Sequence, residues 1–221
     1  MNQQMPVALV TGVGPGTGAA IVRRFAQGGY AVAMLARNRE RLALLQREIA
    51  NSHAYPSDVT DEAQLDSTLA AIRADLGTPR VLIHNAVGGA FGNFMEIEPA
   101  VLNSNFQVNT MALLHLARRL APAMIEAGEG AIIASGNTSA LRGKANFAGF
   151  APTKAAQRIL AEAIARELGP KGVHVAYVLI DAVIDLAWTR KRWPEAPDDF
   201  FIKPAAIADE IWRVWRPSKS K

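Results

Sequence analysis

Cysteine is absent from the 221 residues, which excludes disulfides, thiolate catalysis and cysteine-based zinc sites. Long apolar runs are missing as well, since none reaches the roughly 18 residues that a membrane-spanning helix needs. The first ten residues, MNQQMPVALV, lack the basic region of a signal peptide. We therefore expect a cytoplasmic protein with no membrane segment.

The chain also lacks a large excess of either positive or negative charge. There are 24 Lys and Arg residues against 20 Asp and Glu residues, a net charge of +4. Stretches such as RNRERLALLQRE mix both signs, and the one dense basic run is TRKRW at 189–193. This pattern is typical of a solvated surface rather than a nucleic-acid interface. No spacing of His, Asp and Glu indicates a metal site.

Hydrophobic residues make up half of the chain and recur as short apolar runs that alternate with longer helical patterns. The expected strands are Val7–Thr11, Tyr30–Ala36, His53–Tyr55, Arg80–His84, Gly130–Ser135 and Gly172–Ile180. The expected helices cover 17–28, 38–50, 61–76, 99–127, 152–168 and 204–215. This alternation predicts one α/β domain over residues 1–221, a doubly wound, Rossmann-like parallel sheet in three layers, with ligands beyond the carboxyl ends of the strands.

A glycine-dense turn joins the first strand to the first helix in VALVTGVGPGTGAAIVRRF. Gly12, Gly16 and Gly18 permit positive φ, close approach to a phosphate, and tight packing of helix on strand. The helix N-terminus adds free N–H groups and the positive end of its dipole. The segment therefore predicts a nucleotide site that holds a pyrophosphate.

Within this segment, TGVGPGTG resembles the T-G-x-x-x-G-x-G loop of the short-chain dehydrogenase/reductase family, and the likeness extends over most of the chain. SDVTDEAQL, HNAVGG and FQVNTMALL resemble the family's third-strand Asp-Val, its Asn-Ala-Gly turn and its active-site asparagine helix. Val87 stands in the place of that turn's glycine, and residues 180–182 replace the Pro-Gly of the sixth strand. The resemblance implies the cofactor-binding residues Thr11, Gly12, Gly16, Thr17, Gly18, Asp58, Val59, Asn85, Ala86 and Lys154.

The second strand indicates which nicotinamide cofactor binds. NAD-preferring sites usually place a carboxylate at this strand end, to bind the ribose hydroxyls. Here Ala36 is followed by Arg37, with Arg39 and Arg41 beyond. A guanidinium binds a 2′-phosphate bidentately, so Arg37 favours NADP over NAD. Pro15 stands where some NADP-binding relatives carry a basic residue.

The catalytic residues are those that the resemblance implies. In the family, a tyrosine exchanges a proton with the substrate oxygen, and a lysine four residues later lowers the tyrosine's pKa and holds the ribose. An asparagine holds a water that links the lysine to solvent. Lys154 and Asn109 match, whereas Phe150 stands where the tyrosine is expected. The spacing of 150 and 154 places both on one face of a helix.

The family's serine, which orients the carbonyl, is replaced by Asn137. Its amide donates hydrogen bonds, and the hydroxyls of Ser135, Thr138 and Ser139 surround it. We therefore count Asn137, Thr138 and Ser139 among the candidate catalytic residues, with Lys154, Asn109 and position 150. Tyr177, the one tyrosine nearby in this half, is expected to pack in the core.

Four explanations of Phe150 stay open. In the first, Phe150 is a laboratory substitution, and in the second the enzyme uses another proton donor. In the third, the protein binds the cofactor without turnover, and in the fourth the motif is misaligned. Another donor would be Thr138, Lys154 or a water held by Lys154. The alignment of P-T-K-A-A on Lys154 and the pattern R-G…F-x-x-x-K favour a natural branch of the family without the tyrosine.

Residues 182–203 fall where the family has its substrate lid. The segment's aromatic and basic side chains suit either an apolar pocket that also meets an anion or an anchored surface segment. The chain ends soon after the last helix, where the family generally adds one more strand, so we expect either a sheet of six strands without that strand or a chain that lacks its natural C-terminus. The alanine-rich helix 152–168 suits packing on a partner, and the resemblance implies a homodimer or homotetramer.

The sequence thus predicts an atypical NADP-dependent oxidoreductase that acts on a small-molecule carbonyl or alcohol. The alternative is a cofactor-binding protein, a sensor or scaffold, with little or no redox turnover. A nucleic-acid-binding module is a third hypothesis, and it would bind in a salt-dependent manner.

Overall fold

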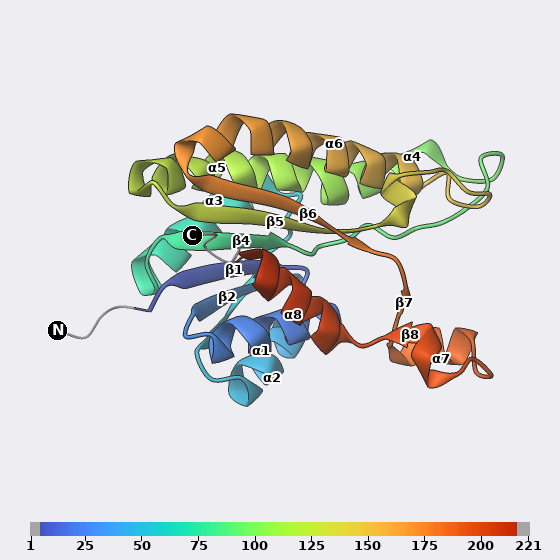
Figure 1. The fold of residues 1–221 in the computed structure, drawn as a ribbon, viewed down its shortest axis with the longest axis horizontal. Coiled ribbons are helices and arrows are strands. Elements are labelled where there is room, and N and C mark those ends of the chain that lie inside the picture. The colour runs from blue at the N-terminus through green and yellow to red at the C-terminus, as the bar shows by residue number, and fades with distance from the viewer. Residues whose placement is uncertain (1–4, 216–221) are drawn as a thin grey trace, which may run out of the picture.

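The fold is organised by a sheet of six parallel strands in the order β3-β2-β1-β4-β5-β6 (Figure 1). The computed structural model describes residues 5–215. The strands are β1 (Val7–Thr11), β2 (Ala31–Ala36), β3 (Ser52–Pro56), β4 (Pro79–His84), β5 (Gly130–Asn137) and β6 (Val173–Ile180). The predicted doubly wound α/β fold is confirmed, and every strand lies within two residues of its expected ends.

Helices cover both faces of the sheet and give three layers (Figure 1). One face carries α1 (Thr17–Gln27), α2 (Arg39–Glu48) and α8 (Pro204–Trp215), and the other carries α3 (Glu62–Asp75), α5 (Ala112–Ala127) and α6 (Ala151–Leu168). Alternate side chains of a strand point to opposite faces, so Val7 and Leu9 pack under the second group of helices while Ala8 and Val10 pack under the first. The chain order reverses between β1 and β4, which places a ligand crevice at their carboxyl ends.

The long helix expected over 99–127 is interrupted. It consists of α4 (Pro99–Phe106), a π-helical segment (Gln107–Met111) and α5, which follow one another directly. A π-helical turn inside an α-helix shifts the backbone hydrogen bonds by one residue, and such turns are frequent at functional sites. Asn109, the asparagine implied by the family resemblance, lies in this segment.

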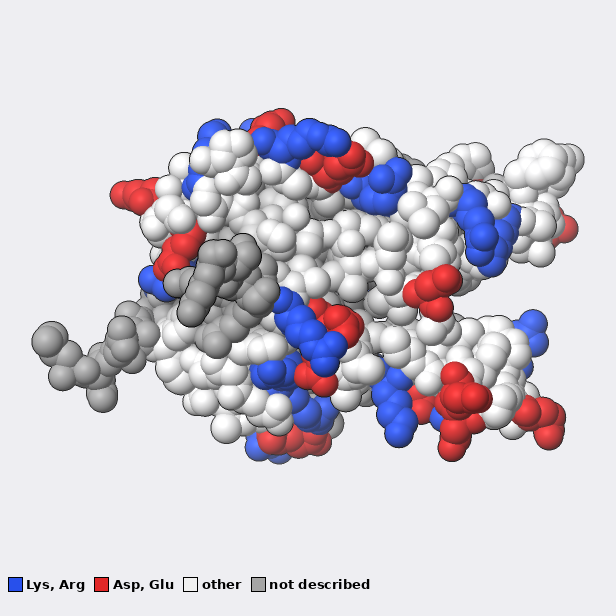
Figure 2. Space-filling model, viewed as in Figure 1, with Lys and Arg blue, Asp and Glu red and all other residues white. Residues whose placement is uncertain are grey.

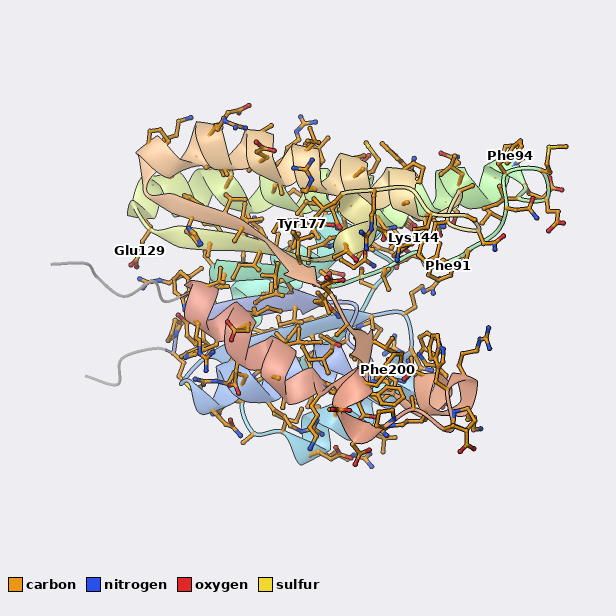
Figure 3. The ribbon with its side chains drawn as sticks, turned by 45° about the vertical axis from the view of Figure 1, so that its right-hand side comes forward. Phe91, Phe94, Glu129, Lys144, Tyr177 and Phe200 are labelled. Atoms are coloured by element: carbon orange, nitrogen blue, oxygen red, sulfur yellow. The ribbon has the colours of Figure 1, made fainter. Side chains whose placement is uncertain are left out.

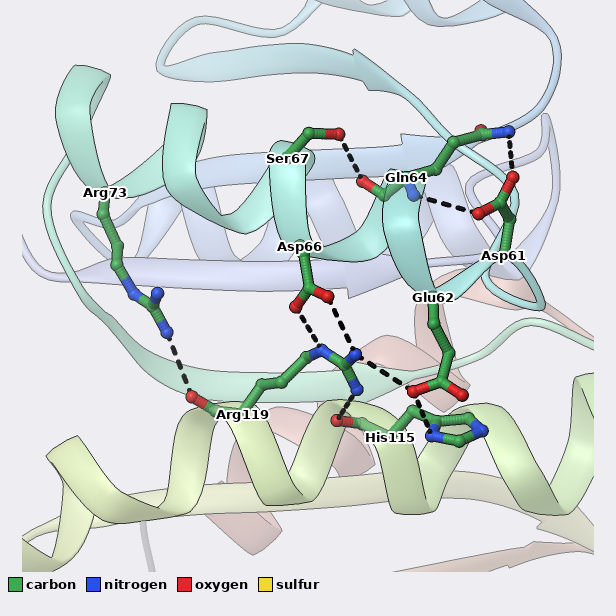
Figure 4. A network of polar contacts seen from close by, with 8 residues as sticks. All are labelled: Asp61, Glu62, Gln64, Asp66, Ser67, Arg73, His115 and Arg119. Atoms are coloured by element: carbon green, nitrogen blue, oxygen red, sulfur yellow. Dashed lines mark hydrogen bonds and ion pairs between the residues drawn. The ribbon is translucent and has the colours of Figure 1, made fainter.

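A cluster of ionic side chains fixes α3 against α5 (Figure 4). The Arg119 Nε lies 2.7 Å from Asp66 Oδ1, and another guanidinium nitrogen lies 3.1 Å from Glu62 Oε2. His115 Nδ1 lies 3.2 Å from the same Glu62 oxygen. The Arg119 hydrogen bond holds the pKa of the Asp66 carboxyl below its usual range. His115 is thus part of an inter-helix contact.

The segment 182–203 forms a small lobe of its own (Figure 1). The strands β7 (Val183–Ile184) and β8 (Phe201–Ile202) pair in parallel, and the short helix α7 (Ala187–Arg192) lies between them in the chain. Arg190 fastens this lobe, because its guanidinium binds Asp185 and Asp198, each at 2.7 Å, and lies 4.0 Å over the Phe201 ring. The sequence predicted the segment but none of its elements.

The surface in Figure 2 carries acidic and basic side chains interspersed, with no face of one sign in this view. Within residues 5–215, no helix is long and apolar enough to cross a membrane, and no group of three potential metal ligands gathers. The expected loss of a last strand concerns residues beyond Trp215, and 216–221 lie outside the described part of the chain.

An aromatic cluster joins α8 to α1 and the start of β2. The Phe25 ring is fully buried and meets Tyr30 and Trp212 edge to face, with centroids 5.5 and 5.1 Å away. Trp215 Nε1 donates to the Tyr30 hydroxyl at 2.9 Å. The last helix is therefore held against α1 and Tyr30 by ring packing.

Phe25→Ala is expected to lower the free energy of unfolding by about 3–5 kcal/mol, because it leaves a cavity among packed rings. Urea unfolding followed by far-UV circular dichroism measures the loss. Leu44→Ala, at a side chain 57% exposed on α2, is the control and should change the free energy by about 0.5 kcal/mol or less. A loss of less than about 1 kcal/mol for Phe25→Ala would contradict this view of the cluster.

Candidate functional site

The turn after β1 passes directly against the turn after β4. Gly12 has φ of +67°, and a Cβ on it would lie 2.4 Å from the Ala86 Cα. A Cβ on Gly18 would lie 2.7 Å from the Gly12 carbonyl oxygen. Any side chain at either position would push backbone apart, so both glycines are required by the close approach of the chain. This agrees with what the sequence pattern predicted for the loop.

Polar side chains at the ends of β1 and β4 fix the two turns together. The Thr11 Oγ1 accepts from the backbone N–H groups of Asn85 and Ala86 at 3.2 and 3.3 Å, and Asn85 Nδ2 donates to the Gly12 carbonyl at 3.1 Å. Four of the predicted cofactor residues thus form one joint. This joint places the N-terminus of α1 over the carboxyl ends of the strands.

His84 supports the joint from below as a buried, neutral ring. Burial, reinforced by the nearby positive charge of Lys154, lowers the pKa of His84 to about 4. Its Nε2 lies 3.1 Å from the Val108 carbonyl and its Nδ1 lies 3.0 Å from Thr11 Oγ1. With the proton on Nε2, the ring donates to Val108 and accepts from the Thr11 hydroxyl, so both nitrogens are satisfied.

The N-terminus of α1 is suited to an anion. Gly16 is the N-cap and Thr17 the first helical residue, no side chain caps the helix, and no acidic residue lies in the first turn. Helix N–H groups and the dipole favour negative charge at such an end. The Leu186 side chain lies against Gly16, where a Cβ would be 2.3 Å from Leu186 Cδ2. The small lobe thus meets the glycine loop.

The predicted adenosine-side residues lie along the ends of β2 and β3. Arg37 is exposed in the turn after β2, and Asn38 Oδ1 caps α2 by accepting from the Arg41 N–H at 2.8 Å. Asp58 Oδ1 accepts from the Thr60 N–H and hydroxyl at 2.9 and 2.8 Å. Val59 is buried and packs with Ala86 and Ala112, which connects this edge of the crevice to the turn after β4.

A line of hydrogen bonds runs from the glycine loop to α6. Asn85 Oδ1 accepts from the Ser135 hydroxyl at 3.0 Å, and the Ser135 carbonyl accepts from Lys154 Nζ at 3.1 Å. Lys154 Nζ also donates to Gln157 Oε1 at 2.6 Å, and Gln157 Nε2 donates to the Asn109 carbonyl at 2.7 Å. The sequence placed Lys154 and Asn109 in one site, and the structure joins them through Gln157.

Asn109 closes the line on the turn after β4. Its Oδ1 accepts from the Gly88 N–H at 2.9 Å, and its Nδ2 donates to the Gly88 carbonyl at 3.0 Å and to Thr153 Oγ1 at 2.8 Å. All polar atoms of this side chain are satisfied by protein. Asn109 therefore fixes the turn after β4 to α6.

Lys154 is buried, with 3% of its surface exposed. Desolvation disfavours the ammonium and lowers its pKa from 10.5 to about 7. No carboxylate contributes to this shift, so the partners of the ammonium are carbonyl oxygens. The group can therefore change its charge state near neutral pH.

Phe150 precedes α6 as its N-cap residue and is 4% exposed. The Phe91 ring covers it at 4.9 Å between centroids, and Phe91 meets Phe147 at 5.0 Å. In Figure 3, Phe91 and Lys144 lie near each other in the upper part of the molecule, and Phe200 lies below them in the small lobe. Position 150 is thus one member of an aromatic group.

Two loops meet beside this aromatic group. The Gly92 N–H donates to the Asn146 carbonyl at 2.9 Å and the Ala148 N–H donates to the Gly92 carbonyl at 3.2 Å, which makes a single parallel bridge. Asn105 Nδ2 donates to the carbonyls of Ala90 and Gly149 at 3.1 and 2.7 Å. The turn after β4 is therefore tied to the segment before α6.

Asn137 is the last residue of β5, Thr138 and Ser139 follow it, and all three are partly buried. Asn137 Oδ1 accepts from the Ser139 N–H at 3.1 Å and caps a short 3-10 turn. That contact uses the oxygen, so the amide NH2 is the part of the side chain that can donate to a ligand. The Ser135 hydroxyl is already bound to Asn85.

Tyr177 of β6 lies under α6, as Figure 3 shows. Its hydroxyl donates to the Lys154 carbonyl at 3.3 Å, and its ring occupies the space where a side chain on Gly136 would be. Burial raises the pKa of this phenol above its ordinary value. Tyr177 is a packing residue, as the sequence indicated.

Sequence reasoning missed Gln157, Thr153 and Phe91. Gln157 lies three residues after Lys154, so the spacing places both on one helix face and could have identified it. Thr153 bonds Asn109, yet nothing in its own sequence context marks it. Phe91 follows a glycine pair in a loop, where periodicity gives no signal.

The comparisons with known proteins agree with this geometry. A family model described as short chain dehydrogenase matches residues 6–190. D-erythrulose reductase of Gallus gallus is 32% identical over 169 residues, 76% of this chain and 67% of that protein. A 3alpha-hydroxysteroid dehydrogenase of Mediterraneibacter gnavus is 27% identical over 218 residues, 96% of this chain and 84% of its own.

Solved structures are similar over nearly the whole fold. The 3-ketoacyl-(acyl-carrier-protein) reductase of Brucella melitensis, complexed with NADH, aligns with a TM-score of 0.86 and 27% identity, covering 96% of this chain and 91% of that one. A metagenomic short-chain oxidoreductase in complex with NADP aligns with a TM-score of 0.82 and 28% identity, covering 98% and 93%. The chain therefore belongs to the short-chain dehydrogenase family of oxidoreductases.

Proposed function

We propose that this protein is an NADP-preferring oxidoreductase that acts on a small-molecule carbonyl or alcohol without a tyrosine. The observation that carries the proposal is Lys154, which is buried and joined by hydrogen bonds to the glycine loop. Related proteins include reductases and dehydrogenases. Structural neighbours hold NADH or NADP, so a nicotinamide cofactor fits.

The cofactor would lie along the carboxyl ends of β2, β1 and β4. Gly12, Gly16, Thr17 and Gly18 would hold its pyrophosphate at the N-terminus of α1, where the free N–H groups and the absence of acidic side chains favour an anion. Asp58 and Val59 would border the adenine, and Thr11, Asn85 and Ala86 would support the nicotinamide half. Lys154 would hold the ribose hydroxyls. A bound nicotinamide cofactor supplies or accepts the hydride.

Arg37 would select NADP. Its guanidinium is exposed just after β2, and Ala36 at the strand end has no carboxylate that would bind the ribose or repel a 2′-phosphate. Asn38 next to it caps α2, and the exposed Arg39 and Arg41 follow.

The proton would not come from position 150, because phenylalanine has none to give. The Asn137 amide would orient the substrate oxygen, and Thr138 and Ser139 offer hydroxyls beside it. Lys154, with a pKa of about 7, would support a bound water as the donor. The small lobe, residues 182–203, would cover the substrate, since Leu186 already lies against Gly16.

A second candidate function is cofactor binding without turnover. One observation favours it: Phe150 is buried under Phe91 and forms part of a packed aromatic group. A protein that used this site only to sense or hold NADPH would have no need of an acid there. We further propose that residues 1–221 form one cytoplasmic domain that assembles as a homodimer or homotetramer through the alanine-rich surface of α6.

NADPH oxidation over a panel of aldehydes, ketones and quinones distinguishes the two functions. We expect slow turnover by the unmodified protein and a rate about 10²- to 10⁴-fold higher for Phe150→Tyr, since a positioned general acid contributes about that much. The double variant Phe150→Tyr with Phe91→Ala tests whether the covering ring blocks the new hydroxyl. Turnover only by variants that carry the tyrosine would reject the oxidoreductase and support the binding protein.

Arg37→Ala is expected to weaken NADPH binding by about 10- to 100-fold and to leave NADH binding nearly unchanged, because it removes a charge-assisted contact with the 2′-phosphate. Cofactor titration by fluorescence measures both dissociation constants. Arg47→Ala, at the exposed end of α2, serves as the matched control. Equal losses for the two cofactors would refute the NADP preference.

Lys154→Met should change how stability depends on pH. The folded chain holds Lys154 at a pKa of about 7 against an ordinary value of 10.5, so the unfolded chain binds more protons between these values. The stability of the unmodified protein therefore gains with rising pH in this window, and the variant lacks the gain. Urea unfolding at several pH values between 7 and 10 tests this, and parallel curves would contradict it.

A further inference from the structure

Gln157 is a fully buried carboxamide in the middle of the site, with 0% of its surface exposed. Its Oε1 accepts from Lys154 Nζ at 2.6 Å, and its Nε2 donates to the Asn109 main-chain carbonyl at 2.7 Å. Distances this short are direct hydrogen bonds with no water between the atoms. The Gln157 side chain thus links Lys154 to Asn109 in the π-helical segment.

The π-helical segment explains why the Asn109 carbonyl is available to a side chain. Residues 107–111 follow the longer hydrogen-bond pattern, as the Ala112 N–H donates to the Gln107 carbonyl. Side chains insert into a helix ladder where its regular bonding is interrupted. Gln157 makes such an insertion from α6, so the irregular backbone and the buried glutamine are two halves of one contact.

Gln157 also determines where the Lys154 ammonium points. Two of the three N–H groups of the ammonium have protein acceptors, the Gln157 Oε1 and the Ser135 carbonyl at 3.1 Å. One N–H remains for a ligand, and its direction follows from the other two. The amide is a neutral acceptor, so it holds the Lys154 ammonium by a hydrogen bond and not by an ion pair.

The groups that face Lys154 from the neighbouring elements do not replace this role. His84 of β4 is buried and bound to Thr11 and Val108, and Tyr177 of β6 donates to the Lys154 backbone carbonyl. Ser135 offers only its main-chain oxygen, because its hydroxyl binds Asn85. Among these groups, Gln157 alone forms hydrogen bonds with both the Lys154 ammonium and the Asn109 carbonyl.

We propose that Gln157 is a positioning residue that clamps the Lys154 ammonium to the Asn109 carbonyl and closes that path to water. A water between these two groups could pass protons, whereas an amide holds its donor and acceptor ends fixed. The value of the clamp for catalysis rests on the proposed function. The clamp itself is a property of the cofactor-free protein and can be tested there.

The first test measures the Lys154 pKa by NMR of labelled lysine side chains in the cofactor-free protein. Gln157→Leu, which removes the acceptor, should lower this pKa by about 1 or more, because the ammonium loses a charge-assisted hydrogen bond. Gln157→Glu, which keeps an oxygen on Lys154 and adds a negative charge, should raise it. Ile159→Ala, at a side chain 53% exposed on the same helix, is the control and should leave it unchanged.

A second measurement needs no substitution, so it holds even if a variant fails to fold. The Gln157 side-chain amide protons should exchange slowly with D2O, while those of Gln46, exposed on α2, should exchange rapidly. Rapid exchange at Gln157, or a Lys154 pKa that does not move in folded Gln157→Leu and Gln157→Glu, would overturn the clamp.

Titration of the same proteins with NADPH separates the clamp from the proposed function. If the Lys154 pKa moves as expected and no protein binds NADPH, the clamp stands and the proposed function fails. If NADPH binds equally to the unmodified protein, Gln157→Leu and Gln157→Glu, and the Lys154 pKa is the same in all of them, the clamp fails and the cofactor site stands. A weaker affinity in Gln157→Leu that is restored in part by Gln157→Met would indicate packing alone and would overturn the clamp.

Discussion

The close contact between Gly12 and the backbone of Ala86 is the constraint on which the rest of the site depends. The turns after β1 and β4 lie so close together there that a Cβ on Gly12 would not fit between them. Hydrogen bonds of the Thr11 and Asn85 side chains then hold the two turns together. From Asn85 the hydrogen bonds continue to Ser135 and to Lys154. Hydrogen bonds through Asn85 and Ser135 therefore fix the position of Lys154 relative to the glycine loop, although the two lie far apart in the sequence.

The sequence was sufficient to predict the sheet because its strands are apolar on both faces and its helices have clear polar breaks between them. The same signals could not reveal the π-helical segment, since residues 107–111 lie inside one continuous expected helix and differ only in hydrogen bonding. Nor could they reveal β7 and β8, which are two residues each and too short for any periodicity. Their pairing depends on contacts made after the chain has folded.

The candidate site divides in a similar way. The glycine loop with Gly12 was recognisable from its own residues, whereas the family resemblance was needed to bring Asn85, Asn109 and Lys154 to the same site. Gln157 escaped notice because a glutamine on an alanine-rich helix ordinarily faces water. Its burial depends on an acceptor that the interrupted helix supplies from another part of the chain.

The bridge between Gly92 and the segment 146–148 ties two loops that border the same opening. The bridge and the contact between the Phe91 and Phe147 rings make the position of each loop depend on the other. Substitutions in either loop will then be non-additive, because each changes the setting of the other. A new substrate preference in this chain would have to arise by paired changes across both loops rather than by single ones.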